Sequence, residues 1–520
     1  MPRSPTTAAD AAHGLPTLHV EGALRDALDR EVLARLTTED FARFLAERRW
    51  FAAKSGAPRA ARIVSVIPLD WDDGSFAIAR LDVETEDGAH QRYQLPLAVR
   101  DRGAPTSVLA HVESTRGDGL LFDAVEDAAF RRHLADAFAH GVRFERDDAA
   151  WLVEPFGTRT LVVPLEAPIE LGSAEQSNTS IRFADEGILK LFRRLEPGEN
   201  PDVEIGRFLA RAVFPYTPAL FGVARFEDRD PRTGRRETTV SGMLQEFLPG
   251  SVDGWSYALR NEEGGRRSEG APSSVLPPHS FAQDAHRLGE VTRALHEALA
   301  SAGRDEPDFT PEPATAADVE AWARATEGQV RDAVALLERQ IAAKRLPAQH
   351  VNEARALVAR RDEFVGRVRE LGESVRGDAG LRIRHHGDYH LGQVLRTAAG
   401  EFMVIDFEGE PSKPLPERRR KHSALRDVAG MLRSFAYAGA ARAGSGERGA
   451  GSGWEREARA AFLAGYLAGA RPPFLPRDLN NTQRLINLFE TEKVFYELAY
   501  ELNNRPDWIW IPMRGVRGEG

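Results

Sequence analysis

Cysteine is absent from the 520 residues of the chain, which excludes disulfide bonds, thiolate metal sites and cysteine nucleophiles together. Long apolar runs are absent too: no stretch of about 18 apolar residues occurs, and residues 1–14 form no apolar leader. A chain without cysteine suits a reducing compartment. These absences predict a cytoplasmic protein with no membrane partner.

An excess of positive charge is also lacking. The 69 Lys and Arg residues are outnumbered by 79 Asp and Glu residues, which gives a formal net charge of −10. Proteins that bind nucleic acid or anionic membranes without sequence preference are usually basic. We therefore expect no nucleic-acid partner.

The regular elements change in kind along the chain. Strand-like alternation dominates the first half and helical periodicity the second, and no internal repeat is found. A chain of this length allows roughly two to four domains. We expect an α+β protein with the following parts: a disordered tail at 1–18, a small mixed unit at 19–100, a strand-rich lobe at 101–250 and a helix-rich lobe at 251–520.

The segment Arg48-Arg49-Trp50 combines guanidinium groups with an aromatic ring and could form a ligand site. Stacking between arginine and aromatic rings is, however, ordinary packing in proteins. We therefore favour a structural role for these residues.

Three polar side chains near residue 400 form the pattern most typical of catalysis. Asp388 and Gln393 are five residues apart, which is the spacing between the base and the metal-binding amide in a phosphoryl-transfer loop. Asp406 ends an apolar run after a short hairpin whose turn is expected near Gly400. Phosphoryl transfer needs one carboxylate beside the attacking hydroxyl and oxygen ligands that hold Mg2+ against the phosphates. The alternative is a hairpin with a solvated acidic turn.

A polar loop and a lysine precede this region by about 200 residues. Residues 172–180 are rich in small polar side chains, and Lys190 follows on a strand-like run with apolar neighbours. Loop amides and hydroxyls can cradle phosphate oxygens while an ammonium group neutralises them. The predicted phosphate-binding residues are Ser173, Ser177, Asn178, Thr179 and Lys190. A lysine on a strand can also simply face solvent.

Two further elements complete this candidate nucleotide site. Asn200-Pro201 predicts a helix start, which places Glu204 where a glutamate could pair with Lys190. An exposed helix glutamate is the alternative. Gln245 and Phe247 end an apolar strand and are predicted to form the hinge whose backbone pairs with adenine.

The last long helix, expected at 478–503, carries a polar and aromatic stripe. Lys493, Tyr496, Glu497 and Tyr500 lie on one helical face. Aromatic rings stack on sugar C–H faces, whereas ammonium and carboxylate groups bind hydroxyls. Packing of this stripe into the core is the alternative reading.

Six longer motifs include several of these residues and their neighbours: His386-Gly-Asp-Tyr-His-Leu-Gly-Gln-Val-Leu, Ile405-Asp-Phe-Glu-Gly-Glu-Pro, Arg426-Asp-Val-Ala-Gly-Met-Leu, Lys190-Leu-Phe-Arg-Arg, Pro201-Asp-Val-Glu and Asn504-Arg-Pro-Asp-Trp. Together they closely resemble the motifs of bacterial maltokinases. This family belongs to the aminoglycoside-phosphotransferase-like, eukaryotic-protein-kinase-like superfamily. The resemblance begins at Arg48, like the family's N-terminal cap. It implies a bilobal protein-kinase-like fold with a strand-rich N-lobe and a helix-rich C-lobe.

The resemblance also implies a function. Maltokinases transfer the γ-phosphate of ATP to the anomeric hydroxyl of maltose, giving maltose 1-phosphate for α-glucan synthesis. By position, Asp388 would be the base, Gln393 and Asp406 the Mg2+ ligands, and Lys190 with Glu204 the phosphate-binding pair. The acceptor site would include the following residues: His390, Glu408, Lys493, Tyr496 and Tyr500.

Alternatives to this function stay open. Glucosamine kinases share much of the catalytic block, and a non-catalytic, kinase-like partner of trehalose synthase is a different class. The combination of Asp388, Gln393, Asp406 and Lys190 argues against a non-catalytic protein. The loops expected at 257–278 and 439–453 are long for the family, and their role does not follow from the sequence.

Overall fold

The computed structural model describes residues 14–51, 57–71, 75–157, 159–164, 166–172, 178–229, 233–260, 281–443 and 451–517. The chain divides into two compact units. The first comprises the described residues up to Glu204 together with Pro218–Leu248, and the second comprises Ile205–Thr217 and the described residues from Pro249 onward. The strand-rich part therefore precedes the helix-rich part, as the sequence predicts.

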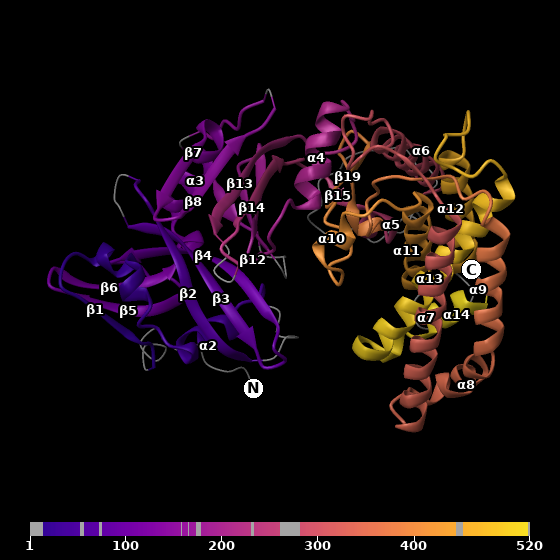
Figure 1. The fold of residues 1–520 in the computed structure, drawn as a ribbon, viewed down its shortest axis with the longest axis horizontal. Coiled ribbons are helices and arrows are strands. Elements are labelled where there is room, and N and C mark those ends of the chain that lie inside the picture. The colour runs from indigo at the N-terminus through magenta and orange to yellow at the C-terminus, as the bar shows by residue number, and fades with distance from the viewer. Residues whose placement is uncertain are drawn as a thin grey trace. The chain divides into compact units, whose positions relative to one another are not determined.

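Two sheets of seven strands each form in the described part of the first unit, coloured indigo to magenta in Figure 1. One has the order β1-β5-β6-β4-β3-β2, with β12 paired to β4, and the other has the order β7-β8-β13-β14-β11-β10-β9. The strands of the first sheet are β1 (Thr17–Val20), β2 (Pro58–Leu69), β3 (Phe76–Thr85), β4 (His90–Arg100), β5 (Val108–Ser114), β6 (Gly117–Asp123) and β12 (Arg194–Leu195). Those of the second are β7 (Val142–Arg146), β8 (Ala149–Pro155), β9 (Ile169–Leu171), β10 (Asn178–Phe183), β11 (Gly187–Phe192), β13 (Leu220–Arg229) and β14 (Arg236–Glu246).

Short helices complete the first unit. They are η1 (Leu24–Leu28), α1 (Arg30–Leu33), α2 (Thr38–Ala46), η3 (Ala124–Glu126), α3 (Ala128–His140) and the beginning of α4 (Pro201–Arg211). Helix α3 buries Phe130, Leu134 and Phe138 in a core that also holds Phe76 of one sheet and Trp151 of the other. This shared core ties the two sheets together through one helix.

The N-terminal tail is shorter than predicted. Strand β1 begins at Thr17, inside the segment 1–18 that we expect to be disordered. Leu18 is 2% exposed, because parallel pairing with β5 brings it into the core of the first sheet. Residues 1–13 lie outside the described part of the chain.

Arg48 and Trp50 have the structural role that the sequence favours. The Arg48 guanidinium group lies over the Phe44 ring and donates to Ser107 Oγ at 2.5 Å. Trp50 is buried beside Tyr93, with ring centroids 5.7 Å apart. These contacts fasten the segment after α2 onto the first sheet.

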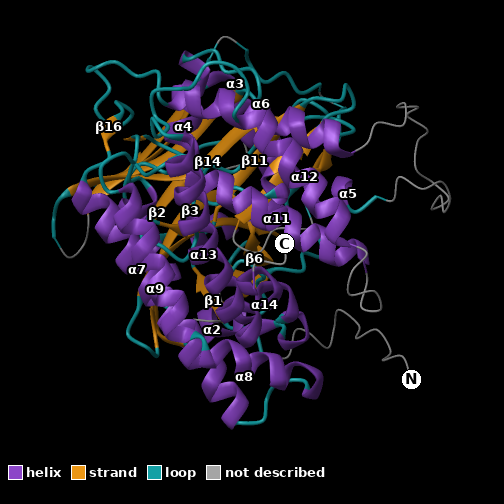
Figure 2. Ribbon diagram, turned by 90° about the vertical axis from the view of Figure 1, so that its right-hand side faces the viewer, coloured by secondary structure: helices purple, strands orange, loops and turns teal. Residues whose placement is uncertain are grey.

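Helices make up most of the second unit (purple in Figure 2). They are α5 (Gly254–Ala258), α6 (Phe281–Leu299), α7 (Ala316–Ala342), η4 (Ala348–His350), α8 (Val351–Ala359), α9 (Arg361–Val375), η5 (Leu391–Gln393), α10 (Leu415–Arg418), α11 (Leu425–Ala443), α12 (Gly451–Tyr466), α13 (Leu479–Asn504), η6 (Pro506–Trp508) and α14 (Trp510–Arg517). Short strands pair as β15-β18-β19 and β16-β17. Their bounds are β15 (Val252–Asp253), β16 (Glu312–Pro313), β17 (Leu381–Arg382), β18 (Val394–Arg396) and β19 (Phe402–Val404).

The two loops expected at 257–278 and 439–453 are shorter than predicted. Residues 257–258 end α5, 439–443 end α11 and 451–453 begin α12. The alanines of Gly439-Ala-Ala-Arg-Ala continue α11 because alanine has the highest helix propensity. Residues 261–280 and 444–450 lie outside the described part of the chain.

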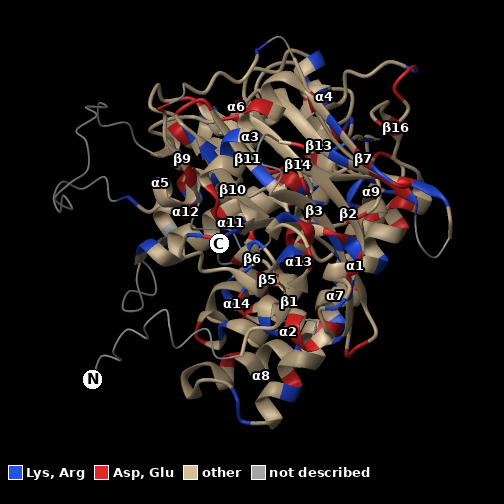
Figure 3. Cartoon of the chain, turned by 90° about the vertical axis from the view of Figure 1, so that its left-hand side faces the viewer, with Lys and Arg blue, Asp and Glu red and all other residues tan. Residues whose placement is uncertain are grey.

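Charges of both signs are interspersed along the chain (Figure 3). This pattern agrees with the small negative net charge relative to the number of ionisable residues. Within the described residues, no helix combines the length and the apolar character that crossing a membrane requires.

Helices α6 and α12 cross with their backbones in contact. A Cβ atom at Gly289 would lie 2.2 Å from the carbonyl oxygen of Phe462, and one at Gly465 would lie 2.0 Å from that of His286. Only glycine allows so close an approach. Because α6 carries His296, this crossing also fixes a residue that contacts the candidate site.

We predict that Gly289→Ala lowers the melting temperature, because the added methyl group must push the two helices apart, at a cost of about 1–3 kcal/mol. Gly328→Ala is the matched control: it lies inside α7 with nothing within 4 Å of the added Cβ, and should stabilise the helix by about 0.5–1 kcal/mol. Differential scanning calorimetry checks both variants. Equal melting temperatures for the two would contradict the crossing.

Candidate functional site

The predicted catalytic segment lies in the second unit. After β17 the chain forms a loop that contains Asp388, then η5, and then the hairpin β18–β19. The hairpin is confirmed, with Val394 opposite Val404 and a turn at Gly400, whose φ is +88°. Asp406 follows directly on this hairpin. The short connection therefore brings the end of β19 back beside η5.

Asp427, on the first turn of α11, anchors the catalytic loop. Its carboxylate accepts hydrogen bonds from the backbone amides of His386 at 2.7 Å and Gly387 at 2.9 Å, and it contacts His296 Nε2 at 3.1 Å. Burial alone would raise the pKa of Asp427, but His385 and the hydrogen bond with His296 lower it below the usual carboxyl range. Asp427 is therefore a buried carboxylate whose hydrogen-bond partners are two backbone amides of the loop and the imidazole of His296.

His386 links the catalytic loop, which carries Asp388, to the acidic loop, which carries Asp406. Its Nε2 donates to the carbonyl oxygen of Ile405 at 2.9 Å, while its Nδ1 accepts from the amide of Asp388 at 3.4 Å. Ile405 precedes Asp406 directly. The ring therefore fixes the spacing between the loop that carries Asp388 and the loop that carries Asp406.

Gln393 and Asp406 lie in contact. Gln393 Nε2 donates to Asp406 Oδ2 at 2.8 Å, and the amide of Ile405 donates to the backbone carbonyl of Gln393 at 3.0 Å. Asp406 has a φ of +67°, in the left-handed region that residues other than glycine adopt uncommonly. Backbone and side-chain bonds together hold these two oxygen-bearing groups beside each other.

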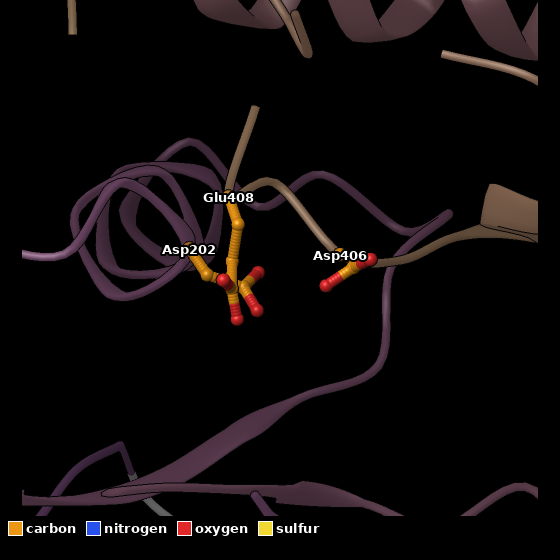
Figure 4. Close-up of side chains that lie close together, drawn as sticks. All are labelled: Asp202, Asp406 and Glu408. Atoms are coloured by element: carbon orange, nitrogen blue, oxygen red, sulfur yellow. The ribbon is translucent and has the colours of Figure 1, made fainter. Parts of the chain in front are cut away.

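Glu408 adds a second carboxylate to the acidic loop. One oxygen of Glu408 lies within 4.8 Å of one oxygen of Asp406 (Figure 4). Carboxylate and amide oxygens are the ligands that Mg2+ prefers. The donor set of Gln393, Asp406 and Glu408 therefore fits a hard divalent cation.

Asp388 opens onto a cavity of about 190 Å³ within the second unit. The walls come from the catalytic loop, the acidic loop and helices α7, α11 and α13. Lys493 Nζ lies 3.3 Å from Asp388 Oδ1 and 5.1 Å from the centre of the Tyr496 ring. The structure thus brings Lys493 and Tyr496 together with Asp388 in one cavity, and the acceptor role of these residues stays a prediction.

The surroundings shift the pKa of two groups beside Asp388: that of Lys493 is raised, and burial lowers that of His390. Burial alone would lower the pKa of Lys493, but Asp388 and Glu410 raise it above its usual value. Lys493 therefore carries its charge at neutral pH. His390 Nδ1 accepts from the amide of Gly392 at 3.0 Å, so the neutral ring has its proton on Nε2, which lies 4.0 Å from Asp388 Oδ2.

The remaining predicted acceptor residues lie differently. His390 faces Asp388 but does not line the cavity, and Tyr500 is 42% exposed on the surface of α13 with Arg505 over its ring. Glu497, which shares the stripe, is buried and accepts two hydrogen bonds from Arg433 at 3.0 and 2.9 Å. The stripe is therefore partly cavity wall, partly surface and partly helix packing.

In the first unit, Lys190 lies on β11 and pairs with Asp202. The Nζ–Oδ2 distance is 3.1 Å, and Asp202 is 2% exposed. Asp202 and Glu204 both belong to the first turn of α4. The sequence predicted Glu204 as the partner of Lys190 and not Asp202, although an acidic residue beside the helix-starting Pro201 is a signal for the same role. The pairing of Lys190 with Glu204 stays a prediction.

The predicted phosphate loop is described only at its end. Asn178 and Thr179 begin β10, and the Thr179 hydroxyl accepts from Arg193 Nε at 2.8 Å. Ser173 and Ser177 lie outside the described residues. The role of these four residues therefore stays a prediction.

The predicted hinge residues end strand β14. Gln245 pairs with Ile188 of β11. The amide of Phe247 donates to the carbonyl of Glu186 at 3.0 Å, and Arg182 lies over the Phe247 ring. Because the Phe247 amide already has a partner, adenine pairing at this hinge also stays a prediction.

Sequence reasoning missed the residues that hold the site in place. Asp427 binds the catalytic loop from α11, His296 contacts Asp427 from α6, and His386 links the loop itself to the loop that carries Asp406. One signal was available for Asp427: it is a single acidic residue among the buried Leu425, Val428 and Ala429. A buried charge needs partners, so this pattern indicates a structural anchor.

Comparisons with known proteins agree on the kind of fold. A model of the maltokinase N-terminal cap domain matches residues 44–127. Glucosamine kinase of Streptacidiphilus jiangxiensis is 28% identical over 387 residues, which is 73% of this chain and 78% of that protein. Glucosamine kinase of Mycolicibacterium smegmatis is 28% identical over 355 residues, which is 67% of this chain and 77% of that protein.

Solved structures of glucosamine kinase are also similar. One, in complex with glucosamine, ADP and inorganic phosphate, has a TM-score of 0.62 at 23% identity, covering 94% of this chain and 98% of that chain. Another, in crystal form B, has a TM-score of 0.64 at 21% identity with the same coverage. The predicted α+β, kinase-like fold with an N-terminal cap is thereby confirmed.

We predict that Asp427→Asn destabilises the protein by about 3 kcal/mol, because an amide cannot accept from both backbone amides and the histidine as a carboxylate does. Asp332→Asn, on the exposed face of α7, is the matched control and should leave the protein unchanged. Calorimetric melting of the two variants provides the measurement. An unchanged melting temperature for Asp427→Asn would show that the loop does not depend on this anchor.

Proposed function

We propose that this chain is an ATP-dependent sugar kinase that transfers the γ-phosphate of ATP to the anomeric hydroxyl of maltose and forms maltose 1-phosphate for α-glucan synthesis. The observation that carries the proposal is the cavity that Asp388 shares with Lys493 and Tyr496. A carboxylate, an ammonium group and an aromatic ring are the groups that a sugar hydroxyl and a sugar ring face need. The cap-domain match at residues 44–127 supports a maltokinase in particular.

Five of the predicted residues have roles in this reaction. Asp388 accepts the proton of the attacking hydroxyl as the new phosphorus–oxygen bond forms and ADP leaves. Lys190, held by Asp202, neutralises phosphate oxygens of the nucleotide. Gln393 and Asp406 would hold Mg2+, which when bound neutralises charge on the transferring phosphoryl group. Lys493 would orient the acceptor beside Asp388.

The carboxylates that line the cavity already have partners. Three carboxylates of the lining each have a basic partner there: Asp388 has Lys493 at 3.3 Å, Glu410 has Lys413 at 3.0 Å, and Glu492 has Arg426 at 2.6 Å. The fourth carboxylate, Asp427, accepts from backbone amides. A sugar ammonium group would have to compete with these cations, whereas sugar hydroxyls can bond to both members of each pair.

Glucosamine is the second candidate acceptor. It rests on the similarity to two glucosamine kinases, each matched over more than three quarters of its own length. The cationic amine of glucosamine would place a further positive charge near Lys493. Association with trehalose synthase, the other partner that the resemblance suggests, stays a prediction.

An ADP-release assay across maltose, glucosamine, glucose and aminoglycosides tests the proposal. We expect release with maltose above all, and a loss of about 10²–10⁴-fold in Asp388→Asn because the general base is removed. Asp332→Asn should retain full activity. Faster turnover of glucosamine than of maltose would transfer the assignment to the second acceptor, and the absence of release with every sugar would refute a sugar kinase.

Tyr496→Ala separates acceptor binding from packing. A ring stacked on the acceptor should contribute on the order of ten- to hundred-fold to kcat/KM for maltose, with the KM for ATP and the melting temperature unchanged. Phe495→Ala provides the comparison: Phe495 is buried against Phe364 and does not line the acceptor cavity, so its loss should lower the melting temperature by an amount equivalent to about 3–5 kcal/mol. If Tyr496→Ala behaves like Phe495→Ala, the tyrosine serves packing and not the acceptor.

A further inference from the structure

A second cavity in the helical unit has no part in the proposed reaction. It has a volume of about 180 Å³ and lies among α9, α11, α12, α13 and α14. Its apolar wall includes Phe364 and Val494, and its polar wall includes Asn487 and Thr491. The remaining polar lining is dominated by guanidinium groups.

Helix α13 separates this cavity from the one beside Asp388. Residues 489, 492, 493 and 496 line the acceptor cavity, whereas 487, 490, 491, 494 and 495 line the second one. At 3.6 residues per turn these two sets lie on opposite faces of the helix. The second cavity is therefore a distinct site within the same unit.

Arg433 forms the buried end of the second cavity. Its side chain is 4% exposed, and its Nε and Nη2 atoms both donate to Glu497 Oε2. Among the described residues, its third nitrogen, Nη1, has no hydrogen-bond partner. A Cβ atom at Gly515 would lie 2.6 Å from Nη1, so only a glycine at this position leaves room for the group.

Two further arginines line the cavity. Arg459 is bound to Glu490 through both of its terminal nitrogens, at 2.8 and 3.0 Å, and Arg367 is exposed at the cavity edge. With Arg433 they contribute three positive charges, against one negative charge each from Glu490 and Glu497. The cavity therefore carries a net charge of about +1, and Nη1 of the largely buried Arg433 is available as a donor there.

From this geometry we infer that the second cavity binds a small phosphate monoester. A guanidinium group binds phosphate through parallel N–H donors, and such charge-assisted bonds are strong when the donor is buried. Arg433 Nη1 and Arg367 would contact the phosphate oxygens, and the apolar wall would contact a short carbon skeleton. The inference does not depend on the acceptor or on the activity proposed above.

Calorimetric titration with glycerol 3-phosphate tests this inference, with inorganic phosphate as a parallel probe that lacks the carbon skeleton. We expect one molecule of glycerol 3-phosphate to bind each chain, more tightly than inorganic phosphate. Arg367→Gln should weaken binding about tenfold by removing a charge-assisted contact. Gly515→Ala should abolish binding by displacing Nη1.

Gly366→Ala is the matched control. It lies next to Arg367 in α9, with nothing within 4 Å of the added Cβ, and should bind as the wild type does. The same titrations with saturating ATP should give the same affinity, because none of the proposed nucleotide-binding residues lines this cavity. The inference is overturned if the wild type binds neither probe, if ATP abolishes binding, or if Arg367→Gln binds glycerol 3-phosphate as tightly as the wild type.

Discussion

The carboxylate of Asp427 is the interaction on which the catalytic region depends. It accepts hydrogen bonds from two backbone amides of the loop that carries Asp388 and so fixes this loop to the first turn of α11. The loop forms few regular backbone bonds of its own, so a buried acceptor must satisfy its donors. His296, held in turn by Tyr466 at 2.9 Å, shields this carboxylate and links it to α6 and α12. Three helices thus determine where the catalytic loop lies.

The position of the catalytic loop in turn constrains the loop that carries Asp406. His386 bonds at once to the carbonyl before Asp406 and to the amide of Asp388. A displacement of one loop must therefore displace the other. The strained φ of Asp406 is held by these surrounding bonds, since such a conformation persists only where the neighbouring structure imposes it.

The sequence predicted local features well because spacing along the chain determines them. The hairpin after Gln393, the order of strand-rich and helix-rich parts and the face of α13 that carries Lys493 and Tyr496 all follow from residue types at fixed intervals. The partners that a side chain meets in the tertiary fold do not follow from such intervals. Asp202 lies two residues from the predicted Glu204, and only the fold shows that its carboxylate meets Lys190.

Position 497 shows the same limit on one helix. Periodicity places Glu497 with Tyr496 and Lys493, yet the neighbouring α11 supplies Arg433, and the pair becomes part of the helix interface. Which polar residue of a stripe faces a ligand depends on the side chains of the adjacent helix. Arg433 and Glu497 are 64 residues apart in the sequence, so the periodicity of α13 alone does not reveal their contact.

The path of the chain between the two units has a consequence for how the protein can be made. Ile205–Thr217 belongs to the helical unit, although the chain then returns to the strand-rich unit for Pro218–Leu248. Phe208 is 3% exposed and stacks on Phe309 with ring centroids 4.0 Å apart. During synthesis this apolar segment leaves the ribosome about 100 residues before its partner ring, so it stays uncovered for several seconds at usual elongation rates. A helical fragment that starts at Pro249 would lack a piece of its own core, and a strand-rich fragment that ends at Leu248 would carry that piece exposed. Neither unit can therefore be cut from the gene as one continuous, self-sufficient stretch.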